Sequence, residues 1–137
     1  MGIDSHHLLK QNPAVREKTQ QRSSILEALH ELGRPVTAQE LLETAAANSP
    51  GLGLATVYRT LKRLVDVGEV RKIEVAGVPP HYEMEDDQHH HFFVCEDCHK
   101  MFDLAGCPGG FKKLLPSGFK MKSHEVVIYG ACPDCGV

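Results

Sequence analysis

The sequence predicts an α+β fold: a helical N-terminal domain that ends in a β-hairpin, followed by a C-terminal domain in which four cysteines hold short strands together. Apolar residues first recur at helical spacing, and after Gly68 they occur in short runs typical of strands. Two C-x-x-C pairs occur, both in the second half of the chain. We place the domains at residues 1–84 and 89–137, with residues 85–88 as the hinge.

Charge divides the chain in the same way. The formal net charge is −3, and residues 1–84 contribute nothing to it because they hold ten basic and ten acidic side chains, whereas residues 85–137 hold five against eight. A hydrophobic fraction of 42% and a charged fraction of 24% are typical of soluble globular proteins. No apolar run approaches the ~20 residues that span a bilayer, and no signal peptide precedes the first helix. We therefore expect a cytoplasmic protein with no membrane partner.

Three helices are expected in the first domain. The first begins near residue 19 and is ended by Gly33 and Pro35, whereas residues 1–18 should form a weak helix or an arm. Its buried face consists of Ile25, Leu29 and Leu32. A capping box, Thr37 with Glu40, starts the second helix, which should run to about Ala47. The third should run from about residue 54 to Val67, with a buried stripe of Val57, Leu61, Leu64 and Val65.

A β-hairpin should follow the third helix. Residues 69–75 and 80–84 are expected to pair around a turn that contains Gly77 and two prolines. Three helices followed by a hairpin is the order of a winged-helix DNA-binding domain, in which one helix enters the major groove. One face of the third helix can contact phosphates and base edges. The candidate DNA contacts are Thr56, Tyr58, Arg59, Lys62 and Arg63.

The two cysteine pairs predict a structural zinc site. Two-residue spacing lets both thiolates of a pair reach one ion, and two pairs complete a tetrahedral set. The ligands would be Cys95, Cys98, Cys132 and Cys135. Buried or redox-active cysteines are the alternative. The 33 intervening residues should form strands at 100–104 and 121–130 and a helix at 108–115, after a first strand at 89–95. These elements predict an α/β domain, which we expect to be the dimerisation domain of the functional hypothesis below.

Histidines and carboxylates gather near the hinge and suggest a second kind of metal site. Alternate residues of a strand share a face, so His89 and His91 should point together and His90 opposite. Imidazole and carboxylate ligands suit Zn(II), Fe(II) or Mn(II). The candidate regulatory ligands are His81, Glu83, His89, His90, His91, Asp103 and His124. A solvated strand with histidines that bind nothing is the alternative.

Together these features resemble the ferric uptake regulator (Fur) family of bacterial metal-responsive regulators. GLATVYRTL is similar to the family's recognition helix, HHHFFVCEDCHKMFDL to its histidine-rich strand and first zinc knuckle, and SHEVVIYGACPDCG to its last strand and second knuckle. The resemblance covers the chain from about Arg16 onward. It implies DNA contacts at Tyr58 and Arg59 and structural zinc on the four cysteines. It further implies a regulatory site at Glu83, His90 and Asp103, and a second site at His89, His91 and His124.

The chain departs from the family pattern at several expected ligands. Pro35 and Phe92 stand where the family often has histidines, and Gly110 lies near the position of a glutamate of the second site. His81, or His6 or His7 of the N-terminal arm, could supply a replacement. Asp103, rather than glutamate, resembles the peroxide-sensing branch. Cys107 is interpreted as a turn cysteine without a function, with a redox or metal-ligand role as the alternative.

The functional hypothesis is a homodimeric, metal-responsive repressor of double-stranded operator DNA. Zinc would stabilise the dimer, and a regulatory divalent metal at the hinge would switch operator affinity. One alternative is a metal-dependent hydrolase that uses the histidine and carboxylate cluster, although no hydrolase motif is present. Another is an oxidant-responsive DNA binder whose only metal is structural zinc. The sensed metal, the operator and any assembly beyond a dimer stay open.

Overall fold

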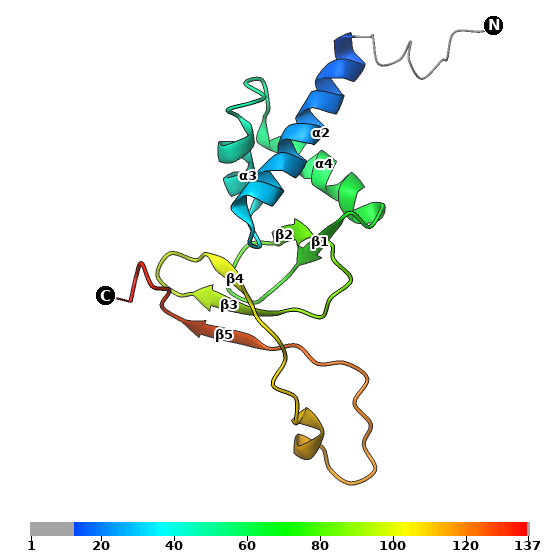
Figure 1. The fold of residues 1–137 in the computed structure, drawn as a ribbon, viewed down its shortest axis with the longest axis vertical. Helices are drawn as coiled ribbons and strands as arrows, with labels where there is room; N and C mark the ends of the chain where they lie inside the picture. The colour runs from blue at the N-terminus through cyan, green and yellow to red at the C-terminus, as the bar shows by residue number, and fades with distance from the viewer. Residues whose placement is uncertain (1–12, 137) are drawn as a thin grey trace, which may run out of the picture.

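The computed structural model describes residues 13–136 and confirms the α+β fold class (Figure 1). Helix α2 (Pro13–Leu32) is longer than predicted, because it starts at Pro13 and not near residue 19. Proline is favoured in the first turn of a helix, and the next residues are largely good helix formers such as Arg16 and Lys18. The prediction relied on apolar residues that recur at helical spacing. The first residues of α2 lack this pattern, so the start of the helix was missed. The candidate ligands His6 and His7 lie outside the described residues.

Helix α3 (Ala38–Ala45) begins at the predicted capping box. The Glu40 amide donates to Thr37 Oγ1 (3.2 Å), and the Thr37 amide donates to the Glu40 carboxylate (2.9 Å). Arg34 also pairs with this carboxylate at 2.6 Å. Burial alone would raise the pKa of Glu40, but the hydrogen bonds from Arg34 and Thr37 hold it below its usual value. The helix ends at Ala45, two residues earlier than predicted.

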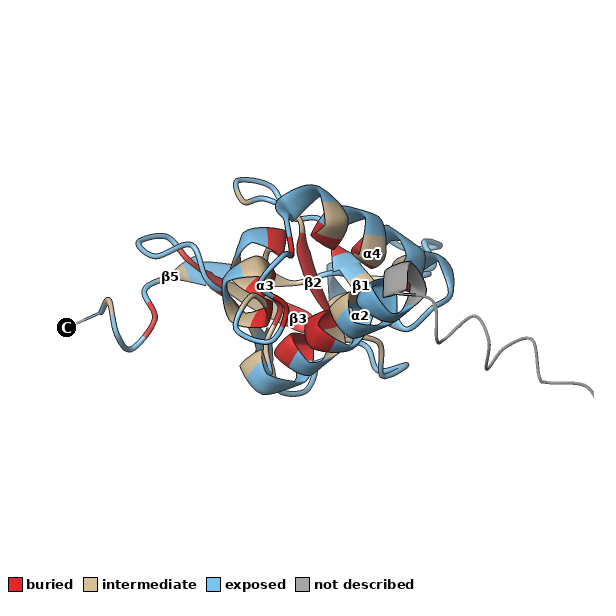
Figure 2. Ribbon diagram, turned by 90° about the horizontal axis from the view of Figure 1, so that it is seen from above, coloured by how far each residue is buried: buried red, intermediate tan, exposed pale blue. Residues whose placement is uncertain are grey.

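Helix α4 (Leu54–Asp66) completes the helical part and packs against α3 and the hairpin. The hairpin pairs β1 (Val70–Ile73) with β2 (His81–Met84) in antiparallel register. Val36 and Tyr82 exchange backbone hydrogen bonds of 2.9 and 2.7 Å, which ties the hairpin to the segment before α3. The core of this part contains Ile25, Leu29, Leu41, Val57, Leu61, Leu64, Val70 and Tyr82. Figure 2 shows the buried residues gathered where α2, α3 and β2 meet.

A three-stranded sheet forms the second part, with the strand order β4-β3-β5. The central strand β3 (His91–Cys95) pairs antiparallel with β4 (Met101–Leu104) and parallel with β5 (Val127–Gly130). Ile73 of the hairpin packs with Val94 and Met101 in a small second core. No helix in the described part of the chain is long and apolar enough to cross a membrane.

Residues 105–126 leave the sheet between β4 and β5 and project away from the helices (Figure 1). The predicted helix at 108–115 is only a 3-10 turn, η1 (Phe111–Leu114). Gly109 and Gly110 before it have positive φ, and Pro116 after it disfavours a helical Leu115, so neither end can extend. The predicted strand at 121–130 forms only from Val127, and the one at 89–95 only from His91.

Candidate metal centres and DNA-contacting helix

Four cysteine sulfurs meet where β3 and β5 end. Their ligand atoms all lie within 4.8 Å of one another, and all four thiols are free. Sulfurs ~2.3 Å from a tetrahedral zinc ion would lie ~3.8 Å apart. The sulfurs of Cys98 and Cys132 are 3.8 Å apart. The donor set and its spacing therefore fit structural zinc, held by Cys95, Cys98, Cys132 and Cys135.

The backbone prepares this cluster for a cation. The amides of Cys98 and Cys132 donate to Cys95 Sγ at 3.5 and 3.4 Å and lower the pKa of Cys95 to about 6. In contrast, its hydrogen bond with Cys132 raises the pKa of Cys135 to about 12. One thiolate therefore forms readily, and further thiolates beside it are disfavoured without a compensating positive charge. Zinc supplies that charge when it is bound.

A second cluster joins the hairpin to the sheet. Glu83 of β2, His90 just before β3 and Asp103 of β4 have their ligand atoms within 4.8 Å of one another. His90 Nδ1 lies 2.7 Å from the Asp103 carboxylate and 3.3 Å from that of Glu83. Burial, and then the nearby Asp103 carboxylate, raise the pKa of Glu83 to about 8. Two carboxylates this close favour either a shared proton or a bound cation.

Acidic side chains of residues 85–88 and Arg71 of β1 lie next to this cluster. His90 Nε2 lies 2.8 Å from the Asp86 carboxylate, and Arg71 of β1 pairs with Glu83 (3.4 Å), Asp86 (3.1 Å) and Glu85. Hydrogen bonds from Arg71 hold the pKa of Glu85 below its usual value. These contacts connect the hairpin directly with the chain at 85–90. The segment predicted as the hinge therefore lies beside the candidate regulatory ligands.

His81 does not join this cluster, although the sequence placed it among the candidate ligands. Its side chain is fully buried, and its Nδ1 donates to the Pro79 carbonyl at 2.7 Å. Its Nε2 has no hydrogen-bond partner among the described residues. Burial lowers the pKa of His81, so this ring is neutral at pH 7. His81 belongs to the packing below α3, where Glu40 and Arg34 lie near it.

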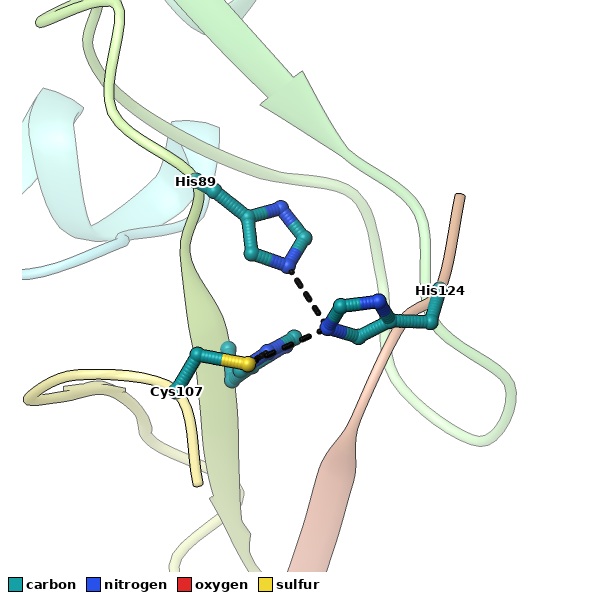
Figure 3. A group of neighbouring side chains, drawn as sticks. His89, Cys107 and His124 are labelled. Atoms are coloured by element: carbon teal, nitrogen blue, oxygen red, sulfur yellow. Dashed lines mark hydrogen bonds between the residues drawn. The ribbon is translucent and has the colours of Figure 1, made fainter. Parts of the chain in front are cut away.

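A third cluster lies at the start of β3 and is drawn in Figure 3. His89, His91 and His124, which the sequence grouped together, lie with their ring nitrogens close to one another. The structure adds Cys107, which the sequence analysis interpreted as a turn cysteine without a function. In the sequence, one feature pointed to a metal-binding role for Cys107. It is the cysteine outside the two C-x-x-C pairs, and it lies in the half of the chain that is rich in histidine.

The candidate DNA contacts lie on α4. Tyr58, Arg59, Lys62 and Arg63 are exposed, and the half-buried Thr56 accepts a 3.0 Å hydrogen bond from Arg59. Within the described residues, no carboxylate pairs with the basic side chains of this face. Arg59 and Arg63 also line a hollow between α4 and α2, together with Lys18 and Arg22. Arg22 is already paired with Glu69 at 3.1 Å, so the uncompensated positive charge that this surface offers to an anionic partner comes from α4.

A winged-helix domain joined to a sheet that carries thiol and imidazole clusters defines a metal-binding transcriptional regulator. A sequence model described as the ferric uptake regulator family matches residues 15–129. The chain therefore belongs to the ferric uptake regulator family, whose members are metal-responsive transcriptional regulators. Membership favours the regulator hypothesis over the hydrolase alternative.

Individual relatives agree with this assignment. Transcriptional regulator FurA of Mycobacterium tuberculosis is 32% identical over 123 residues, covering 87% of this chain and 82% of the relative. The peroxide operon regulator of Bacillus subtilis is 30% identical over 121 residues, covering 85% and 82%. The fold is also that of the ferric uptake regulator of Francisella tularensis, solved with iron, with a TM-score of 0.68 and 23% identity over 85% of this chain and 91% of that one.

Proposed function

We propose that this protein is a homodimeric repressor whose operator affinity rises when a divalent metal binds Glu83, His90 and Asp103. The single observation that carries the proposal is the position of this cluster. Its ligands come from β2 of the hairpin, from the residue just before β3 and from β4 of the sheet. A cation held by all three would fix the angle between the DNA-contacting part and the sheet.

Operator recognition is assigned to α4. Arg59, Lys62 and Arg63 would neutralise phosphates or contact guanine edges, and Tyr58, which is 47% exposed, would pack against a base or sugar. The hollow between α4 and α2 adds two further basic side chains to the same surface. We expect double-stranded DNA in the bacterial cytoplasm to be the partner.

Dimerisation is assigned to the sheet domain, residues 89–137. Strand β5 is an edge strand in the order β4-β3-β5, and it exposes Ile128 (50%) and Tyr129 (45%). An unpaired edge that carries exposed apolar side chains is a favourable surface for a second copy of the chain. A two-fold dimer would then present two α4 helices to the half-sites of a pseudo-palindrome.

The switch depends on a difference between two states of the hinge. Without metal, His90 is shared among Asp86, Asp103 and Glu83, and Arg71 bridges the hairpin to the acidic hinge. A metal that binds one hinge angle better than others shifts the population towards that angle. A coupling free energy of ~1–3 kcal/mol would change operator affinity ~5–150-fold.

The test is fluorescence anisotropy with a duplex selected from random-sequence DNA by the metal-loaded protein. The protein is first freed of labile metal, and Zn(II), Fe(II) or Mn(II) is then added separately. We expect one of these ions to raise the affinity of the unaltered protein ~5–150-fold. Glu83→Gln should remove this response. Glu74→Gln is the matched control, because its exposed carboxylate pairs with Lys72 and, within residues 13–136, lies outside the three clusters.

Arg59→Ala separates DNA contact from metal sensing. Loss of one base contact should cost ~1–3 kcal/mol of affinity, with the metal response of the remaining binding unchanged. If no ion changes the operator affinity of the unaltered protein, the proposed switch at Glu83, His90 and Asp103 is wrong.

A further inference from the structure

We propose that Cys107 is a thiolate ligand of a zinc site completed by His89, His91 and His124, distinct in its metal preference from the cluster at the hinge. The proposal rests on the proposed function, because it adds a second ion to the same regulator. It favours the metal-ligand role that the sequence left as the alternative for Cys107. Compared with a site of three histidines, a site with a sulfur ligand should prefer a different metal. It would also attach the segment around Cys107 to the metal.

The distances fit one tetrahedral ion. His89 Nε2 lies 3.2 Å from His124 Nε2, and Cys107 Sγ lies 3.1 Å from His124 Nε2 (Figure 3). His91 Nε2 lies 3.2 Å from the same sulfur. With zinc bonds of ~2.0–2.1 Å to nitrogen and ~2.3 Å to sulfur, a tetrahedron has edges of ~3.3 Å between nitrogens and ~3.6 Å from nitrogen to sulfur. Small outward movements of the four side chains would therefore accommodate the ion.

A buried imidazole faces the sulfur at this position. His91 is only 2% exposed, yet its polar contacts are the sulfur and the amide of Val126, which donates to Nδ1 at 3.2 Å. The remaining proton of this neutral ring then points from Nε2 at Cys107. A metal at this nitrogen would move that proton to Nδ1, at the expense of the hydrogen bond from Val126, and would displace the thiol proton of Cys107. Metal binding here is therefore expected to release the thiol proton of Cys107.

The donor set differs from that of the hinge cluster. Glu83, His90 and Asp103 offer only nitrogen and oxygen, whereas the Cys107 cluster adds a soft thiolate. Thiolate ligands favour zinc over iron(II) and manganese(II) more strongly than carboxylates do. The two clusters use consecutive histidines, and one hollow between β1 and the sheet is lined by His89, His90 and His124 together. Zinc at the Cys107 cluster therefore binds beside the hinge without competing for its ligands.

The site would also close the excursion between β4 and β5. Cys107 and His124 stand at the two ends of this excursion, whose residues 105–126 belong to no strand of the sheet. The excursion carries the exposed side chains of Leu114 and Phe119. Residues 105–126 contribute nothing to the small apolar core of the sheet, so burial does little to hold this segment in place. A metal that links its two ends to each other and to His91 of β3 would reduce the conformational freedom of the segment. Metal at Cys107 is thus expected to order this segment.

The experiment uses the full chain with zinc kept at the four-cysteine cluster and all labile metal removed. Cobalt(II) is added as a spectroscopic probe, and zinc affinity is measured against a chromophoric chelator. We expect cobalt to give a thiolate-to-metal charge-transfer absorption that zinc then abolishes. Cys107→Ser should lose this absorption. Its zinc affinity should fall at least ~10-fold, because mutation of a residue that only hydrogen-bonds a metal ligand already lowers metal affinity by about that factor.

Cys107→Asp distinguishes a ligand from a packing residue. A carboxylate should restore metal binding without the charge-transfer absorption and should shift the preference from zinc towards manganese(II). Ser123→Ala is the matched control, because it lies beside His124 and offers no ligand in the cluster. Zinc retained at the four cysteines shows that each variant is folded.

The proposal is overturned if Cys107→Ser binds zinc as tightly as the unaltered protein, or if added cobalt gives no Cys107-dependent absorption. Its failure is distinguishable from failure of the hinge switch. Glu83→Gln should leave the charge-transfer absorption intact, and operator affinity is measured separately. A protein with this absorption but without metal-dependent DNA binding would keep the Cys107 site and lose the proposed function.

Discussion

The two halves of this molecule are stabilised in different ways. In the helical half, thirteen of the residues that the structure describes are buried in one continuous cluster, contributed mainly by all three helices and by the hairpin. In the sheet half, the buried apolar cluster contains only Ile73, Val94 and Met101, and Ile73 comes from the hairpin. The sheet half also exposes Leu114, Phe119, Ile128 and Tyr129.

This difference explains where the chemistry-bearing residues lie. A small domain with few buried apolar side chains needs another source of stability, such as a metal or a partner chain. The four-cysteine cluster and the exposed edge strand β5 both lie in the half that has this need. The helical half has a larger buried apolar cluster to stabilise it, so the surface of α4 proposed for DNA is not needed for stability.

The largest effect is expected for Cys132→Ser. Structural zinc in small peptides contributes ~10–16 kcal/mol, so its loss should unfold the sheet half while α2, α3 and α4 stay folded. Elemental analysis measures bound zinc, and segment-resolved hydrogen exchange measures order in each half. Cys107→Ser serves as the control, since it lies outside the four-cysteine set and should retain that zinc. If β3 and β5 of Cys132→Ser keep their protection from hydrogen exchange, the sheet half does not depend on zinc for its stability.

Leu61→Ala should destabilise the helical half and leave the zinc of the sheet half in place. Leu61 is fully buried on α4, and truncation of such a side chain costs ~2–5 kcal/mol. Denaturant unfolding followed by helical circular dichroism should show this loss, with zinc content unchanged. Leu114→Ala, a change at a 79% exposed site, should have little effect. Zinc loss that accompanies Leu61→Ala would mean that the halves fold as a single unit.

Sequence patterns predicted the parts of this fold that depend on short-range order. The capping box at Thr37, the stripe of α4 and the two cysteine pairs are all readable over a few residues. They gave the fold class and the four-cysteine cluster. The domain boundaries at 84 and 89 stay a prediction.

The missed features depend on contacts that spacing does not reveal. Cys107 lies between glycine and proline, and its partners His91 and His124 are 16 and 17 residues away along the chain. An irregular excursion brings them together, and no periodicity describes such a path. His81 shows the opposite error, because strand alternation with Glu83 suggested a shared site, whereas His81 is buried beside Pro79.

Ile128→Lys tests whether a partner chain supplies stability to the sheet half. A charged side chain at the centre of the proposed β5 interface should cost at least ~2 kcal/mol of dimer affinity. Analytical ultracentrifugation over a concentration series measures this change. Leu114→Lys introduces the same charge on η1, outside the edge strand, and should leave the dimer intact. Equal dimer affinity in both variants would place the interface elsewhere.

The smallest effect is expected for Thr37→Ala, in the half that relies on burial. Removing Oγ1 leaves the Glu40 amide without its acceptor and should cost ~1 kcal/mol of unfolding free energy. Thr37→Ser keeps a hydroxyl at the N-cap and should recover most of this loss. Urea unfolding of α2, α3 and α4 provides the measurement, while zinc content and dimer affinity should not change. If Thr37→Ala instead weakens the dimer, the bridge between Val36 and Tyr82 transmits strain from α3 into the sheet half, and the contrast between the two halves is smaller than their cores suggest.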